Sequence, residues 1–254
     1  MIFSTADLLT PVPSGSLIIP NGYSRKLSLI LPTYNEGENI QKIIRVLSRL
    51  LANQDYELIV VDDDSPDYTW KLALELLPEY PQLKVMRRTQ EKGLSTAVLR
   101  GWQVATGELL GVIDADLQHP PEVLLQLLEL MDSGVDLAVA SRHVEGGGVS
   151  EWNLWRRFLS RGAQMLGLLI LPEVITRLCD PLSGYFIVRR KAISEIPFSP
   201  IGYKILIEVT ARGRINQIAE CGYVFEERQA GASKVTWKQY LEYLQHLFKL
   251  RFSV

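Results

Sequence analysis

Two strongly apolar runs that each end in aspartates constrain this chain more than any other feature. Residues 59–64 read Ile-Val-Val-Asp-Asp-Asp, and residues 109–116 read Leu-Leu-Gly-Val-Ile-Asp-Ala-Asp. Short apolar runs of this kind are typical of buried strands. A buried strand that ends in carboxylates delivers charge to the carboxyl edge of an open α/β sheet, where such sheets bind ligands. The two clusters therefore predict a site for nucleotide and metal chemistry.

The spacing within the second cluster favours a metal site. Asp114 and Asp116 are two positions apart, so they point to the same side if the strand stays extended. Two carboxylates on one side suit a hard divalent cation that also holds a diphosphate.

The order of predicted elements indicates an α/β fold. Strands are predicted at residues 27–31, 58–61, 83–86, 109–114 and 137–140. Between them the apolar residues recur at helical spacing, and Asp64-Ser65-Pro66 and Pro120-Pro121 supply helix starts. Strands that alternate with helices imply right-handed crossovers and a mainly parallel central sheet flanked by helices.

The alternation stops after Arg142. A glycine-rich loop at 145–148, a strand near 185–189, a helix over 203–211, a strand over 215–225 and a final helix over 237–251 are predicted there. Residues 1–24 are rich in Pro, Ser, Gly and Thr and predict a flexible leader. Residues 25–254 then form a single domain, with a nucleotide half at about 25–140 and an acceptor half at about 141–254.

Composition excludes several classes of protein. With 27 Lys and Arg against 29 Asp and Glu, the net charge is -2, which argues against a nucleic-acid binder. Cys179 and Cys221 are the only cysteines, and this usage favours a reducing, cytoplasmic setting. No apolar run approaches the roughly 20 residues of a spanning helix, so no transmembrane segment is predicted.

Residues 32–36, Pro-Thr-Tyr-Asn-Glu, follow the first predicted strand. With them the chain resembles the inverting family 2 glycosyltransferases of the GT-A fold, from Leu27 to about Lys234. The resemblance implies that the donor nucleotide is bound by Pro32, Tyr34, Glu36, Val61 and Asp63. A helix-capping turn, with Asn35 as cap and Glu38 three residues later, is the alternative interpretation of the same residues.

Residues 114–118, Asp-Ala-Asp-Leu-Gln, resemble the DxD motif of that family. The resemblance implies that Asp114, Asp116 and Gln118 hold Mg²⁺ or Mn²⁺ against the nucleotide diphosphate, with Ala115 also at the donor. His119 follows, but a single histidine without a second ligand at metal spacing is predicted to be structural.

Strings in the second half narrow the resemblance to the polyprenyl-phosphate-sugar synthases of the dolichol-phosphate mannosyltransferase type. The matching segments are 140–147, 156–161, 180–186, 202–204 and 228–234. The resemblance implies that Arg142, Arg156 and Ser160 bind the acceptor phosphate. It also implies that Lys204, Arg228 and Lys234 close over the donor phosphates. Asp116, Arg142 and Arg156 are the expected catalytic residues.

The function implied is inverting transfer of a hexose from a nucleotide-sugar donor to polyprenyl (dolichyl) monophosphate, giving a β-linked product. Mannose from GDP-mannose is the first expectation, and UDP-glucose or another family 2 acceptor is the nearest alternative. A phosphate monoester is mostly a dianion at neutral pH, so this acceptor needs no strong general base. A phospho-receiver module is an alternative from another class. Such modules draw their paired acids from the first strand, whereas in this chain residues 27–36 precede both acidic clusters.

The lipid acceptor implies a membrane surface or an anchoring partner subunit. Many proteins of this type continue into transmembrane helices. Because no transmembrane segment is predicted here, the expectation is a peripheral protein at the cytoplasmic face of a membrane. The apolar run 165–171 and the last helix could lie in that interface. A helix packed on the core is the alternative.

Overall fold

The computed structural model describes residues 8–9, 16–149, 162, 165–226 and 237–253. The strands are β1 Leu8–Leu9, β2 Leu17–Ile18, β3 Arg25–Thr33, β4 Tyr56–Asp62, β5 Leu83–Arg87, β6 Gly107–Val112, β7 Leu137–Ser141, β8 Gly148–Val149, β9 Phe186–Arg189, β10 Pro197–Phe198, β11 Ile218–Gly222 and β12 Val224–Phe225. The helices are α1 Ile40–Leu50, α2 Thr69–Leu74, α3 Leu94–Val104, α4 Val123–Asp132, α6 Pro172–Ile175, α7 Arg190–Ile193, α8 Ile205–Arg212 and α9 Trp237–Ser253.

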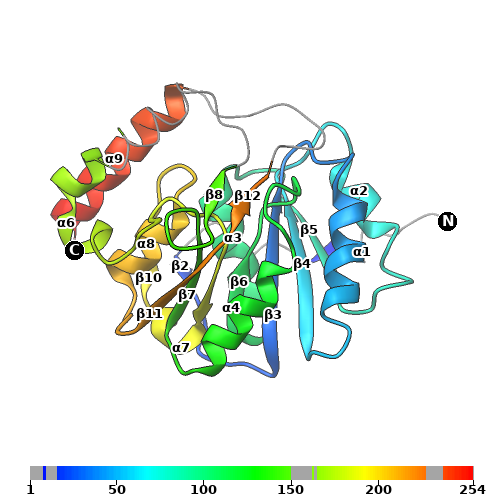
Figure 1. The fold of residues 1–254 in the computed structure, drawn as a ribbon. Coiled ribbons are helices and arrows are strands. Elements are labelled where there is room, and N and C mark those ends of the chain that lie inside the picture. Colours follow the sequence, from blue (N-terminus) through cyan, green and yellow to red (C-terminus); the bar gives the residue numbers. More distant parts are fainter. Residues whose placement is uncertain (1–7, 10–15, 150–161, 163–164, 227–236, 254) are drawn as a thin grey trace.

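An eight-stranded sheet in the order β1-β5-β4-β3-β6-β9-β7-β11 forms the centre of the molecule (Figure 1). β3 pairs in parallel with β4 on one side and with β6 on the other. β9 alone among these strands runs antiparallel to its neighbours, β6 and β7. The predicted mainly parallel sheet flanked by helices is therefore confirmed.

The core lies in two layers, one on each face of the sheet. Leu29 and Leu31 of β3 point into the layer covered by α1, α2 and α4. Ile30, between them, points into the layer covered by α3, α7 and α8. This alternation follows from the two-residue period of a strand. Both faces are apolar because both are covered, as parallel sheets require.

β6 ends earlier than predicted. Its pairings with β3 and with β9 both stop at Val112. Residues 115–116 are in a turn, and Leu117 adopts a left-handed φ of 60°. The prediction that Asp114 and Asp116 share one side of an extended strand is therefore wrong, because the chain has left the sheet before Asp114.

Two predicted helix caps are also wrong. α2 begins at Thr69, after Tyr68 with a left-handed φ of 61°, rather than near Pro66. The Ser65 backbone N–H and hydroxyl donate to the carboxylate of Asp62, at 2.8 and 2.7 Å, so this segment forms a turn at the strand end. α1 begins at Ile40, and Asn35 has a φ of 54°, so Asn35 does not cap it.

The predicted strand over 215–225 is divided by Tyr223. β11 joins the main sheet beside β7, whereas β12 pairs in parallel with β8 of the glycine-rich loop. A side chain at Gly222 would overlap the backbone of residues 145–147. This close approach explains why glycines stand on both sides of the contact.

The prediction that residues 1–24 form a flexible leader is wrong for two segments. β1 extends the sheet beside β5, and β2 pairs with β10. Ile19 is fully buried in the core. The Arg190 guanidinium donates to the carbonyls of Pro20, Ala105 and Gly107 at 3.0, 2.9 and 2.7 Å, so it ties this segment to the start of β6. Two-residue strands carry no periodicity that sequence could reveal.

We expect Arg190→Met to lower the free energy of unfolding by about 2–4 kcal/mol. The change leaves three carbonyls without their charged donor, and buried polar groups without partners are costly. Urea unfolding measures the effect. Arg45→Met, at an exposed arginine of α1, is the control and should change stability by less than about 0.5 kcal/mol. Equal losses in the two variants would contradict the assigned role of Arg190.

Candidate functional site

Charged side chains gather at the carboxyl edge of the sheet, around the end of β3. Asp63 follows β4, Asp114 and Asp116 follow β6, and Arg142 follows β7. The chain runs from β3 to β4 on one side and reaches β6 on the other, so the strand order reverses at β3. Open α/β sheets bind ligands at such a point.

The loop at 114–118 is fixed by hydrogen bonds. Asp116 is buried, and its Oδ1 accepts the backbone N–H of Gln118 at 3.1 Å. The Gln118 side-chain amide donates to the carbonyl of Glu226 at 2.9 Å, and the Glu226 N–H donates back to the Gln118 carbonyl at 2.9 Å. Asp114 is partly open, with a third of its side chain exposed. One short turn thus holds all three predicted metal ligands.

The donor atoms of this loop fit a hard divalent cation. Two carboxylates and one amide oxygen are ligands that Mg²⁺ and Mn²⁺ accept. Within the described part of the chain, no group of three or more His, Cys, Asp or Glu residues is arranged to hold a metal. The loop therefore offers a partial set of ligands, which is typical of sites that Mg²⁺ shares with substrate phosphates.

Arg142 is held at the same edge by a buried ion pair. Its Nε and Nη2 donate to the two oxygens of Asp180, each at 2.7 Å, and its backbone N–H donates to Asp180 Oδ2 at 3.1 Å. Asp180 is fully buried. Burial acts to raise the pKa of Asp180, but the hydrogen bonds and charge of Arg142 outweigh it and hold the pKa below its ordinary value. A bidentate pair of this kind fixes the plane of the guanidinium.

Lys204 and Gly184 bring two further segments to this edge. The Lys204 ammonium donates to the carbonyl of Leu182 at 2.7 Å. Burial and the neighbouring charge of Arg142 lower the pKa of Lys204 to about 8. A Cβ on Gly184 would lie 3.2 Å from the Asp114 carboxylate, so this turn approaches Asp114 closely. The structure thus brings Asp114, Arg142 and Lys204 to the same edge of the sheet.

The predicted nucleotide residues have different environments. Tyr34 is 40% exposed, and the Lys92 ammonium lies 5.5 Å from the centre of its ring. Glu36 is buried and accepts a hydrogen bond from the Asn39 amide at 3.0 Å. Val61 is fully buried in the layer under α3, which removes its side chain from those that can contact a ligand. Pro32 and Ala115 are also buried, so they can line a ligand chiefly through their backbone.

Asp63 braces a neighbouring loop. Its carboxylate accepts the Gly93 N–H at 2.6 Å and the Arg88 Nε–H at 2.8 Å. Arg88 is itself buried and also donates to Thr96 Oγ1 at 3.0 Å. Burial raises the pKa of Asp63 and outweighs the opposing charge of Arg88. These contacts order the segment between β5 and α3, while a contact of Asp63 with a base or ribose stays a prediction.

The family profile described as glycosyl transferase family 2 matches residues 28–196, which include most of β3, both aspartate clusters, Arg142 and Asp180. The chain belongs to glycosyl transferase family 2. Membership excludes the phospho-receiver alternative, and it agrees with the GT-A fold that the resemblance implies.

Two curated relatives of this family 2 chain share most of its length. It is 45% identical over 225 residues to a dolichol-phosphate mannosyltransferase of Pyrococcus furiosus, covering 89% of this chain and 63% of that protein. It is 38% identical over 223 residues to a polyprenol monophosphomannose synthase of Mycolicibacterium smegmatis, covering 84% of this chain and 82% of that protein. The chain therefore spans less than two thirds of the first relative and about four fifths of the second.

A solved structure supports the fold. Glucosyl-3-phosphoglycerate synthase of Mycobacterium tuberculosis, in complex with Mn²⁺, UDP and glucosyl-3-phosphoglycerate, superposes with a TM-score of 0.67 at 22% identity. The match covers 91% of this chain and 80% of that one. At this identity the likeness extends to the fold alone.

The sequence missed two charged residues that build the site of this family 2 chain. Asp180 orients Arg142, and Arg88 orients Asp63. Asp180 stands in a turn string, Asp-Pro-Leu-Ser-Gly, and Arg88 follows directly on β5, but neither position reveals its partner. Four predicted residues, Arg156, Ser160, Arg228 and Lys234, lie outside the described residues.

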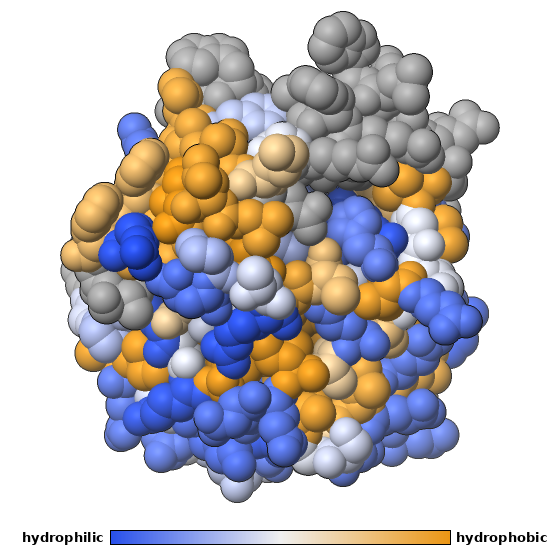
Figure 2. Space-filling model, turned by 60° about the vertical axis from the view of Figure 1, so that its left-hand side comes forward, coloured by the Kyte–Doolittle hydropathy of each residue, from blue (hydrophilic) through white to orange (hydrophobic). Residues whose placement is uncertain are grey.

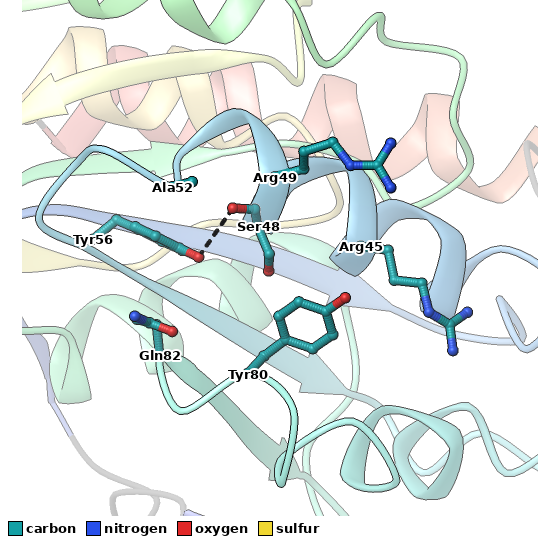
Figure 3. A pocket seen from close by; sticks show the side chains of 7 residues that line it. All are labelled: Arg45, Ser48, Arg49, Ala52, Tyr56, Tyr80 and Gln82. Atoms are coloured by element: carbon teal, nitrogen blue, oxygen red, sulfur yellow. Dashed lines mark hydrogen bonds between the residues drawn. The ribbon is translucent and has the colours of Figure 1, made fainter.

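A cavity of about 280 Å³ lies at the opposite end of the strands (Figure 3). Tyr56 at the start of β4 and Gln82 before β5 line it, together with Arg45, Ser48 and Arg49 of α1. The Tyr56 hydroxyl donates to the Ser48 carbonyl at 3.4 Å. Because this is the amino edge of the sheet, the cavity is separate from the aspartate loops.

We expect Asp180→Asn to lower the free energy of unfolding by about 3–5 kcal/mol at neutral pH, because it leaves the Arg142 charge buried without its partner. The folded pKa of Asp180 lies below the unfolded value near 3.8. The stabilisation is therefore present above the unfolded pKa and is lost as the pH falls through the folded pKa. Urea unfolding from pH 7 down to pH 3 should show that the difference in the free energy of unfolding between wild type and Asp180→Asn becomes smaller in acid.

Asp132→Asn is the matched control, since the Asp132 side chain is 61% exposed in its pair with Lys26. A surface pair contributes about 1 kcal/mol or less. If both aspartate variants lose the same stability, or if the Asp180→Asn gap widens in acid, the description of the buried pair is wrong.

Proposed function

We propose that this chain transfers a hexose from a nucleotide-sugar to polyprenyl (dolichyl) monophosphate, with mannose from GDP-mannose as the donor. The observation that carries the proposal is the pairing of two features at one sheet edge. These are a loop of carboxylates at 114–118 and a guanidinium, Arg142, fixed by a buried aspartate. The first suits a diphosphate with its cation, and the second suits a phosphate monoester. The names of the two curated relatives support the same acceptor class.

Asp114, Asp116 and Gln118 would hold a divalent cation, Mg²⁺ or Mn²⁺. When bound, the cation would neutralise the charge that develops on the departing diphosphate. The Mn²⁺ and UDP in the mycobacterial structure support a divalent metal in this fold. Tyr34, Glu36, Pro32, Ala115 and Asp63 would line the nucleotide, and Lys204, with Arg228 and Lys234, would contact its phosphates.

Arg142, with Arg156 and Ser160, would bind the acceptor phosphate. A phosphate dianion is already a nucleophile, so no carboxylate at this edge has to act as a strong base. Asp180 presents the fork of Arg142 in a fixed plane, and such a fork grips phosphate oxygens in a defined geometry. A phosphate oxygen would attack the anomeric carbon as the bond to the diphosphate breaks. One such displacement converts an α-linked donor sugar into a β-linked product.

An apolar surface patch would contact the lipid bilayer (Figure 2). Residues 165–170 are helical and lie beside α9, whose Tyr243, Leu247 and Leu250 pack on α6 and α8. Their outward side chains form the apolar patch, which comprises Met165, Leu166, Leu168, Leu169, Leu241, Phe248 and Phe252. Leu169 and Phe252 are each 81% exposed. Exposed apolar clusters of this kind mark interaction surfaces. α9 thus fits both interpretations made from the sequence, because one face packs on the core and the other carries exposed apolar side chains.

We therefore propose peripheral attachment at the cytoplasmic face of a membrane, directly or with an anchoring partner. Both cysteines are free, which supports a reducing compartment. Among the described helices, none is long and apolar enough to cross a bilayer.

Transfer assays with the purified protein test the proposed reaction. We expect transfer from GDP-mannose to polyprenyl phosphate with Mg²⁺ or Mn²⁺, and a β-linked mannosyl phosphate by NMR. Asp116→Asn should lower turnover at least about a hundredfold, because metal stabilisation of a leaving group is worth several kcal/mol, while the exposed Asp132→Asn should not. Faster transfer from UDP-glucose would show that UDP-glucose, and not GDP-mannose, is the donor. Transfer only to water-soluble phosphates would refute the acceptor.

Flotation with vesicles of neutral and anionic phospholipid tests the apolar patch. We expect the double variant Leu169→Glu and Phe252→Glu to weaken vesicle binding at least about tenfold, because two apolar contacts with the acyl region become charged. Leu125→Glu, on α4, is the control: Leu125 is also exposed, at 38%, but lies outside the patch. Equal flotation of all variants would contradict the assignment of this face.

A further inference from the structure

We propose that His119 is a positioning residue that holds the Asp114 carboxylate in place for the divalent cation. The inference rests on the proposed function, because it assigns a role at the same metal loop. It also replaces the interpretation of His119 as merely structural.

Three aromatic rings enclose His119. Its ring centre lies 5.3 Å from Tyr185, 5.3 Å from Tyr223 and 5.2 Å from Phe225. We call these three side chains the aromatic box. Only 3% of His119 is exposed. Close packing restricts the rotation of the imidazole, and in the structure the ring has the orientation in which Nε2 faces Asp114.

That orientation places one imidazole nitrogen on the metal loop. His119 Nε2 lies 3.4 Å from Asp114 Oδ2. Asp114 is a third exposed while His119 is buried, so the imidazole backs the carboxylate from inside the protein. The turn at Gly184 passes close to the same carboxylate from another direction. Asp114 is therefore approached both by a residue of its own loop and by a turn from a distant part of the chain.

The other imidazole nitrogen separates a positioning role from a packing role. Nδ1 of His119 is buried and has no hydrogen-bond partner among the described residues. A histidine that served the core alone would be expected to satisfy its buried nitrogens, and an apolar ring could fill the same space. The polar contact of this imidazole is instead directed to Asp114. The proposal requires the tautomer in which Nε2 carries the proton.

The aromatic box also reaches the acceptor side. The ring centre of Phe225 lies 5.8 Å from the guanidinium carbon of Arg142. Phe225 is the last residue of β12, and the backbone N–H of the next residue, Glu226, donates to the carbonyl of Gln118 in the metal loop. His119 and Arg142 thus both lie near the ring of Phe225. Phe225 therefore connects the metal loop with the arginine proposed to bind the acceptor phosphate.

Two substitutions separate the donor N–H from the ring. His119→Gln keeps an N–H at a similar reach and loses the ring, whereas His119→Phe keeps the ring and loses the donor. Mn²⁺ binding in the presence of GDP, or of UDP, is followed by the EPR signal of free Mn²⁺. We expect His119→Phe to weaken Mn²⁺ binding about tenfold, the scale found when a group that orients a metal ligand is removed. His119→Gln should stay within about twofold of wild type.

Controls keep the test decisive. Melting temperatures report whether each variant folds, and His119→Met replaces His119→Phe if the latter does not. His143→Phe, at an exposed histidine, should bind Mn²⁺ as wild type does. If His119→Phe binds normally and His119→Gln does not, the ring matters only for packing and the proposal is refuted. If wild type itself fails to bind Mn²⁺ with nucleotide, the metal assignment falls, and the role of His119 falls with it.

Discussion

The parallel pairing of β3 with both β4 and β6 is the constraint on which the site depends. These ladders are buried on both faces, and both end at the same edge of the sheet, at Ile30 beside β6 and at Thr33 beside β4. The chain must then leave the sheet in tight turns. Asn35, Asp64 and Leu117, one after each of the three strands, all have a positive φ. Backbone strain of this kind persists where the surrounding structure enforces it, and it clusters at functional sites.

The charged side chains at this edge are held by buried partners. Arg142 is fixed by Asp180, and Asp63 by Arg88, in pairs whose members are almost completely buried. A buried ion pair contributes little net stability, but it fixes the orientation of its side chains. Removing one member of the pair destabilises the fold strongly. We infer that these pairs hold their groups ready before any ligand arrives. Such preorganisation is what electrostatic catalysis requires.

The sequence predicted what depends on local pattern. The core strands, the helices between them and the two aspartate clusters all follow from periodicity and from short motifs. The sequence did not predict the features that depend on tertiary contacts. The strands at Leu8–Leu9 and Leu17–Ile18 form only because β5 and β10 are there to pair with them. Val61 points into the core because of the strand period, and the buried environment of His119 is created by Tyr185, just before β9, and by Phe225 of β12.

Paramagnetic broadening of backbone amide NMR signals by Mn²⁺ with GDP tests the central claim most directly, namely that the turn after β6 binds the nucleotide diphosphate through a metal. The account predicts that signals of residues 113–119 and 183–185 broaden first, and that they recover when Mg²⁺ displaces Mn²⁺. Broadening centred on the cavity between α1 and Gln82, or spread evenly over acidic surface residues, would contradict it.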